Sequence, residues 1–187
     1  MILFFDAISS QSYIGLFTNS GELRDSRACV LSWQESSKTI SLIYDFLADA
    51  WVSIADIENI ICVNGPGSFT GVRSVVLVVN TLAYMYPHIF LTPLWFFDLY
   101  EQYPIVKSSS KRDLFVKYKK NDIIHVISNG DFEAQWHQYI FWDVSPGRFV
   151  EEIHCVSEIE YTRIVDQISL KKYKNISPEY IKKPNIS

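Results

Sequence analysis

Glycine, cysteine and positive charge are all scarce in this chain. Its 187 residues include seven glycines, three cysteines and 17 Lys/Arg against 21 Asp/Glu, which gives a formal net charge of -4. With 48% hydrophobic and 20% charged residues, the composition excludes a disordered or fibrous protein. The acidity argues against a protein that binds nucleic acid by itself, because phosphate binding requires a basic surface. The cysteines are odd in number and widely spaced, which predicts reduced thiols and a cytoplasmic location.

A continuous membrane-spanning run is also missing. The uncharged stretch between Arg73 and Asp98 is long enough to cross a bilayer, but Pro87 and Pro93 interrupt it. The first residues, MILFFD, lack a basic segment and reach a carboxylate at Asp6, so they predict a strand and not a signal peptide. We therefore expect no association with a membrane.

The charge is divided unevenly along the chain. Residues 1–106 carry four Lys/Arg against ten Asp/Glu, a balance of -6, whereas residues 107–187 carry thirteen against eleven, a balance of +2. A polar, basic loop at 108–112 separates the two parts. This pattern predicts an N-terminal domain over residues 1–105 and a smaller C-terminal domain with a basic tail over residues 106–187.

The first part alternates between strand-like and helix-like segments. Apolar and β-branched runs predict strands over 2–8, 13–18, 28–32, 59–63 and 88–92. Helical periodicity predicts one helix from Lys38 to Trp51, with Ser36 or Ser37 as its N-cap, and another from Ser74 to Tyr86. The order β-β-β-α-β-α-β resembles a ribonuclease-H-like or actin-like half, an α/β fold with a mixed sheet and flanking helices. The second part is weaker and predicts strands over 114–118, 123–127 and 149–156 and a helix over 158–168.

Three of the seven glycines lie in one segment, Asn64-Gly65-Pro66-Gly67-Ser68-Phe69-Thr70-Gly71-Val72-Arg73. Glycine permits a close backbone approach, and Ser68 or Thr70 can cap the helix that follows. One interpretation is an anion site at the helix N-terminus. The spacing matches neither the dinucleotide fingerprint nor the phosphate loop, so a tight strand-to-helix turn is the other interpretation.

This string resembles the signature of the TsaB (YeaZ) family, and Pro178-Glu179-Tyr180-Ile181-Lys182 is similar to the family's C-terminal element. The resemblance implies an actin-like (ASKHA) fold and a non-catalytic partner of a TsaD-like protein. The pair would work with a TsaE-like ATPase to place threonylcarbamoyl on a tRNA adenosine. The resemblance further implies no cofactor in this subunit, ATP at a subunit boundary, and contact with tRNA only through the partner. Where the family commonly reads Asp-Thr-Ser, this chain has Asp6-Ala7-Ile8.

The predicted helix from Ser74 to Tyr86 has an outer half without charge, made of Ser74, Leu77, Asn80, Thr81 and Tyr84. A helix packed on a sheet usually presents charges to water. An uncharged surface with an aromatic residue is typical of the centre of an interface. Leu77, Asn80, Thr81 and Tyr84 are therefore the predicted partner interface, toward a TsaD-like protein or a second copy of this chain. Coverage by another part of the chain is the alternative.

An enzymatic function is the competing hypothesis. Asp6 ends the first strand, where actin-like kinases keep a metal-orienting carboxylate, so Asp6 with the Gly65–Gly71 loop predicts an ATP-dependent enzyme. A turn or capping role is the more common one for such an Asp. The four histidines are never four residues apart, and no nucleophile motif supports the peptidase that the glycoprotease name suggests. A homodimeric structural module is a third alternative.

A basic segment completes the candidates. It comprises Lys107, Lys111, Arg112, Lys117, Lys119 and Lys120, with Phe115 and Tyr118 between them. In a larger complex this segment would contact tRNA phosphates; otherwise it is a solvated strand and loop.

Overall fold

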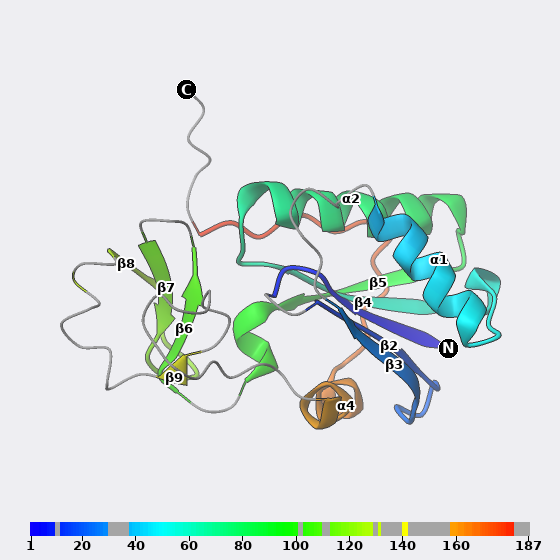
Figure 1. The fold of residues 1–187 in the computed structure, drawn as a ribbon, viewed down its shortest axis with the longest axis horizontal. Helices are drawn as coiled ribbons and strands as arrows, with labels where there is room; N and C mark the ends of the chain where they lie inside the picture. The colour runs from blue at the N-terminus through cyan, green and yellow to red at the C-terminus, as the bar shows by residue number, and fades with distance from the viewer. Residues whose placement is uncertain are drawn as a thin grey trace.

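A five-stranded mixed sheet forms the centre of the computed structural model, which describes residues 1–9, 12–29, 38–100, 103–109, 113–128, 131, 140–141 and 158–181. The strand order is β3-β2-β1-β4-β5 (Figure 1). An antiparallel meander is formed by β1 (Ile2–Asp6), β2 (Ser12–Phe17) and β3 (Leu23–Cys29). Two further strands run parallel to β1: β4 (Asn59–Gly65) and β5 (Phe90–Trp95).

Helices cover both faces of this sheet. The connecting helices α1 (Thr39–Asp49) and α2 (Phe69–Met85) lie on one face, and α4 (Glu158–Gln167) lies on the other (Figure 1). Two short 3-10 turns, η2 (Ile54–Asp56) and η3 (Phe96–Leu99), follow α1 and β5. Because both faces are covered, every residue of β1, β2 and β4 is buried.

A second sheet shares the apolar core on the α4 side. Its order is β8-β7-β6-β9, with β6 (Ile105–Ser108), β7 (Asp113–Lys117), β8 (His125–Ser128) and β9 (Ile140–Phe141). Ile105 and Phe115 of this sheet belong to one buried cluster with Phe4, Phe96 and Tyr161. The predicted division into residues 1–105 and 106–187 stays a prediction.

Residues 170–181, here called the C-terminal strap, return to the first sheet. Tyr173 forms a bridge with Leu91 at the edge strand β5, and the strap then follows α2 toward its N-terminus (Figure 1). Ile176 is buried in the α1–α2 core. Among the described residues, none of the helices has the length and apolar character needed to cross a membrane.

The predicted element order over the first sheet is confirmed, and three of the boundaries that differ have a clear physical reason. The third strand begins at Leu23 because Gly21, with φ 89°, turns the chain within a few residues of β2; residues 30–32 lie outside the described part. Helix α2 begins at Phe69, five residues before the predicted start, because Ser68 caps it. Strand β5 extends through Pro93, which an edge strand tolerates. The strand predicted over 149–156 lies outside the described residues.

Candidate functional site

The glycine-rich loop joins the buried strand β4 to α2. Ser68 has extended backbone angles, and its Oγ accepts a hydrogen bond from the backbone N–H of Gly71 at 3.1 Å. This N-cap satisfies one of the free amides at the start of the helix, as the sequence predicts for Ser68. Thr70 instead lies inside the first turn and is exposed. Pro66 is buried, and a Cβ at Gly67 would lie 2.9 Å from a methyl of Val72, so the loop is tightly packed.

Gly65 lies against the C-terminal strap. Its φ is +145°, and a Cβ there would lie 2.3 Å from the carbonyl oxygen of Glu179. The carbonyl of neighbouring Asn64 accepts a hydrogen bond from Glu179 N–H at 2.9 Å, and its side-chain Nδ2 donates to Ser177 O at 2.9 Å. Two sequence elements that the chain separates by more than 100 residues therefore form one contact.

The strap continues to the first turn of α2. The rings of Phe69 and Tyr180 lie 5.0 Å apart between centroids, and Phe69 is 41% exposed. Partial burial raises the pKa of Tyr180, while the nearby positive charge of Arg73 acts in the opposite direction. Phe69, Tyr180 and Arg73 thus form an aromatic and cationic cluster at the N-terminal end of α2.

The outward face of α2 exposes large apolar side chains. Leu77, Tyr84 and Met85 are 65%, 86% and 59% exposed. Thr81 is half-buried, and its hydroxyl donates to Leu77 O at 2.8 Å. Met85 was not among the residues predicted for the interface, since helical spacing alone assigned it to the inner half. The predicted positions Leu77 and Tyr84 do face outward.

Asn80 differs from the other predicted interface residues. Its Nδ2 donates to Ile176 O at 2.9 Å, and its Oδ1 accepts from Ile176 N–H at 2.9 Å. Both ends of the carboxamide therefore hold the strap. On this flank of α2, the strap provides the coverage by the same chain that the sequence left open as an alternative.

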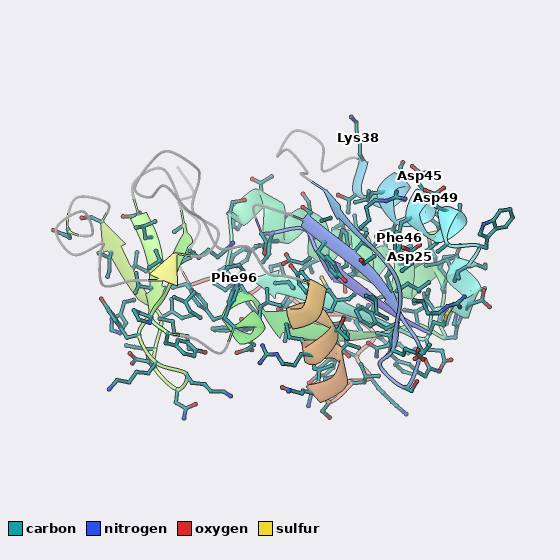
Figure 2. The ribbon with its side chains drawn as sticks, turned by 60° about the horizontal axis from the view of Figure 1, so that its bottom comes forward. Asp25, Lys38, Asp45, Phe46, Asp49 and Phe96 are labelled. Atoms are coloured by element: carbon teal, nitrogen blue, oxygen red, sulfur yellow. The ribbon has the colours of Figure 1, made fainter. Side chains whose placement is uncertain are left out.

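Helix α1 contrasts with α2 in its solvent-facing residues. Lys38, Asp45 and Asp49 are exposed on or beside α1, with Asp25 on the neighbouring β3 (Figure 2). Arg27 connects the two elements through a 2.7 Å ion pair with Asp49. The described surface of α1 therefore has the ordinary charged character of a solvated helix, whereas that of α2 does not.

Asp6 is completely buried and hydrogen-bonded inside the chain. Its Oδ1 accepts from the backbone N–H groups of Ile8 and Ser9, both at 3.1 Å. Its Oδ2 accepts from Ser9 Oγ at 2.6 Å and from Tyr161 Oη at 3.0 Å. Burial raises the pKa of Asp6, while the Ser9 hydroxyl and the charge of Lys107 act to lower it. The carboxylate therefore makes the predicted turn, and it also anchors α4.

Lys107 closes the same region from the second sheet. It is only 1% exposed, its Nζ donates to Ile8 O at 3.1 Å, and the ammonium lies 3.9 Å from the centre of the Phe96 ring. Lys117 is also buried, at 8% exposure. The expectation that these two lysines contact solvent or tRNA is wrong, because both are buried, and Lys107 lies between the two sheets. Lys119 and Lys120 are exposed, and Lys111 and Arg112 lie outside the described residues.

Sequence reasoning missed Lys107 and Tyr161 as neighbours of Asp6 at the end of β1, and it missed the contact of Asn64 with the C-terminal strap at the end of β4. Tyr161 lies on the apolar side of a correctly predicted helix, which indicates burial but not its contact with Asp6. In the part of the chain that the structure describes, no three His, Cys, Asp or Glu side chains converge to hold a metal ion.

Comparisons with known proteins find one family model and solved structures of similar fold. Residues 31–89 match the family model of TsaD, tRNA N6-adenosine threonylcarbamoyltransferase. The structure of YeaZ from Pseudomonas aeruginosa is similar with a TM-score of 0.63 at 15% identity, over 88% of this chain and 89% of that chain. A second structure, titled an uncharacterized protein with similarity to peptidase YEAZ from Pseudomonas aeruginosa, gives a TM-score of 0.59 at 16% identity, over 75% and 73%. No curated protein matches the chain. The chain has a YeaZ-like fold, and the predicted actin-like α/β class is confirmed.

Proposed function

We propose that this YeaZ-like chain is a non-catalytic subunit in the modification of tRNA to threonylcarbamoyladenosine, and that it acts by binding a TsaD-type partner through α2. The observation that carries the proposal is the outward face of α2, where Leu77, Tyr84 and Met85 are exposed. No charged residue of the helix lies between Leu77 and Met85. Large exposed apolar side chains clustered on one helix are typical of a protein interface. The family match of residues 31–89 includes this helix.

The proposal includes other components of the complex. A TsaE-type ATPase and ATP at a subunit boundary would supply the energy-dependent step, and tRNA would bind through the partner. A second copy of this chain is the alternative occupant of the α2 face. Sedimentation of the chain alone shows whether it forms a homodimer. A homodimer that used α2 would compete with the TsaD-type partner for the same face.

Binding to the TsaD-type protein of the same organism tests the proposal. Tyr84→Glu and Leu77→Glu each introduce a charge into the proposed interface, and we expect calorimetry to show binding at least ~30-fold weaker. The matched control is Ile123→Glu, since Ile123 is 73% exposed beside β8 and away from α2. The proposal would be contradicted if the wild-type chain did not bind, or if both α2 variants bound as tightly as the wild-type chain.

The enzymatic alternative is weakened by the surroundings of Asp6. Its two carboxylate oxygens already accept four hydrogen bonds from within the chain, and Lys107 lies beside it. A metal-orienting carboxylate must instead present an oxygen to the ion. ATP turnover by the purified chain that Asp6→Asn abolishes would favour the enzyme.

A further inference from the structure

The C-terminal strap is fixed to the first sheet along most of its length. Lys171 N–H donates to Thr92 Oγ1 at 2.9 Å, and Asn59 Nδ2 donates to Lys171 O at 2.9 Å. Leu91 and Tyr173 exchange two backbone hydrogen bonds at 2.8 and 3.3 Å. Together with the carboxamide of Asn80 on Ile176, these bonds hold the strap to strands and helix alike. The strap is therefore a structural element of the domain.

The glycine-rich loop receives the end of this strap. Asn64 binds it with both its backbone carbonyl and its side-chain amide, and Gly65 leaves room for the carbonyl of Glu179. Any side chain at Gly65 would occupy the position of that carbonyl. The close approach to the strap thus accounts for the glycine without a bound phosphate.

The docked strap places Tyr180 next to the outward face of α2. One side of that helix carries, at intervals of four or seven residues, Phe69, Arg73, Leu77 and Tyr84. Tyr180 contacts Phe69 at the start of this row and lies near Arg73. Arg73 is the single charged residue in the α2 sequence and is exposed. Aromatic residues and arginine are the types that most often dominate binding energy at interfaces.

We propose that the partner-binding face is composite: the glycine-rich loop is the receptor for the strap, and the docked strap adds Tyr180 to the row formed by Phe69, Arg73, Leu77 and Tyr84. This inference rests on the proposed function and names the chemistry of the partner. The face spans about 22 Å of helix at 1.5 Å per residue. It fits a partner helix with an apolar row opposite Leu77 and Tyr84, and a carboxylate near one end opposite Arg73.

Calorimetry with the TsaD-type partner tests the composite face. We expect Tyr180→Ala and Phe69→Ala each to weaken binding about tenfold. Because the two rings contact each other, the affinity lost by the double variant should be smaller than the product of the two single losses. Tyr173→Ala is the matched control, since this strap residue is 50% exposed beside β5, away from the row on α2. Arg73→Glu should weaken binding, and it should be partly rescued by a lysine in place of the opposing partner carboxylate.

Hydrogen exchange tests the receptor role separately. In Gly65→Ala we expect faster exchange of residues 171–181, unchanged exchange in β1 and β2, and the same loss of binding as Tyr180→Ala. Wild-type affinity in both Tyr180→Ala and Phe69→Ala, with binding lost in Tyr84→Glu, would overturn the composite face and leave the proposed function intact. A wild-type chain that binds no TsaD-type protein would overturn both. Unchanged exchange of the strap in Gly65→Ala would overturn the receptor role even if partner binding is observed.

Discussion

Two neighbouring parallel strands, β1 and β4, end in different ways at the same edge of the sheet. Strand β1 ends in the Asp6 carboxylate, which side chains from α4 and the second sheet surround. Strand β4 ends in Asn64 and Gly65, which the backbone of the strap covers. Carboxyl ends of parallel strands are common ligand sites in α/β proteins. Here the chain fills the first with ionic and hydrogen-bonding groups and the second by close backbone packing, so the two should respond differently to substitution and pH.

The largest effect should come from Asp6→Ala. The substitution removes the acceptor of four hydrogen bonds and leaves the buried Lys107 ammonium without its nearby carboxylate. A buried donor left without its acceptor typically costs about 1–3 kcal/mol, and four donors are affected, so urea denaturation should show a loss of several kcal/mol in the free energy of unfolding. Ser9→Ala, which removes one of the donors, is the control and should cost less. A loss below ~1 kcal/mol for Asp6→Ala would contradict the role of this side chain as a buried hydrogen-bond acceptor.

Gly65→Ala should have an intermediate effect at the other strand end. The positive φ disfavours alanine, and the new Cβ would collide with the Glu179 carbonyl, so we expect a loss of about 2 kcal/mol in thermal or urea unfolding. Gly71→Ala is the matched control in the same motif. Gly71 lies within α2, where alanine is preferred over glycine by about 1 kcal/mol, so this variant should be as stable as the wild type or more so. Equal losses in both variants would mean that strap contact is not what requires Gly65.

The smallest difference should appear in the pH dependence. Burial raises the pKa of Asp6 above its ordinary value of 3.8. The folded state then holds this proton more tightly than the unfolded state, so the contribution of Asp6 is fully present below pH 3.8 and is lost as the pH rises through the folded pKa. Asp6→Asn should remove this dependence, whereas Gly65→Ala should retain it. Urea unfolding between about pH 4 and pH 7 measures the difference, and a wild-type stability that rises relative to Asp6→Asn over this range would contradict the direction.

Local patterns predicted the first sheet and its helices because each element there has its own periodicity and turn chemistry. The cap at Ser68 and the outward position of Leu77 and Tyr84 follow from residues within one helical turn or one helix. The position of Asn80 on a helix face was also predictable, but its occupation by Ile176 was not, since that contact joins residues 96 apart.

Burial of charge was the least predictable feature. Lys107 and Lys117 lie in a basic segment that a solvated strand would explain equally well. The surroundings of Lys107 include Phe96 and Asp6, and those of Lys117 include Tyr103 and Asp98, so no short window of sequence contains them. Likewise, the aspartate that ends β1 has the same local sequence whether it orients a metal or closes a turn, and Tyr161, 155 residues away, completes its surroundings.

The bridge between Leu91 and Tyr173 affects the tendency of the protein to aggregate. Strand β5 is at the edge of its sheet, where free backbone groups can recruit a strand from another molecule. Leu91 already uses its N–H and carbonyl on the strap, and Pro93, two residues further on, has no N–H to offer. This edge is thereby closed to edge-to-edge aggregation, and a chain that loses its strap should precipitate at lower concentration.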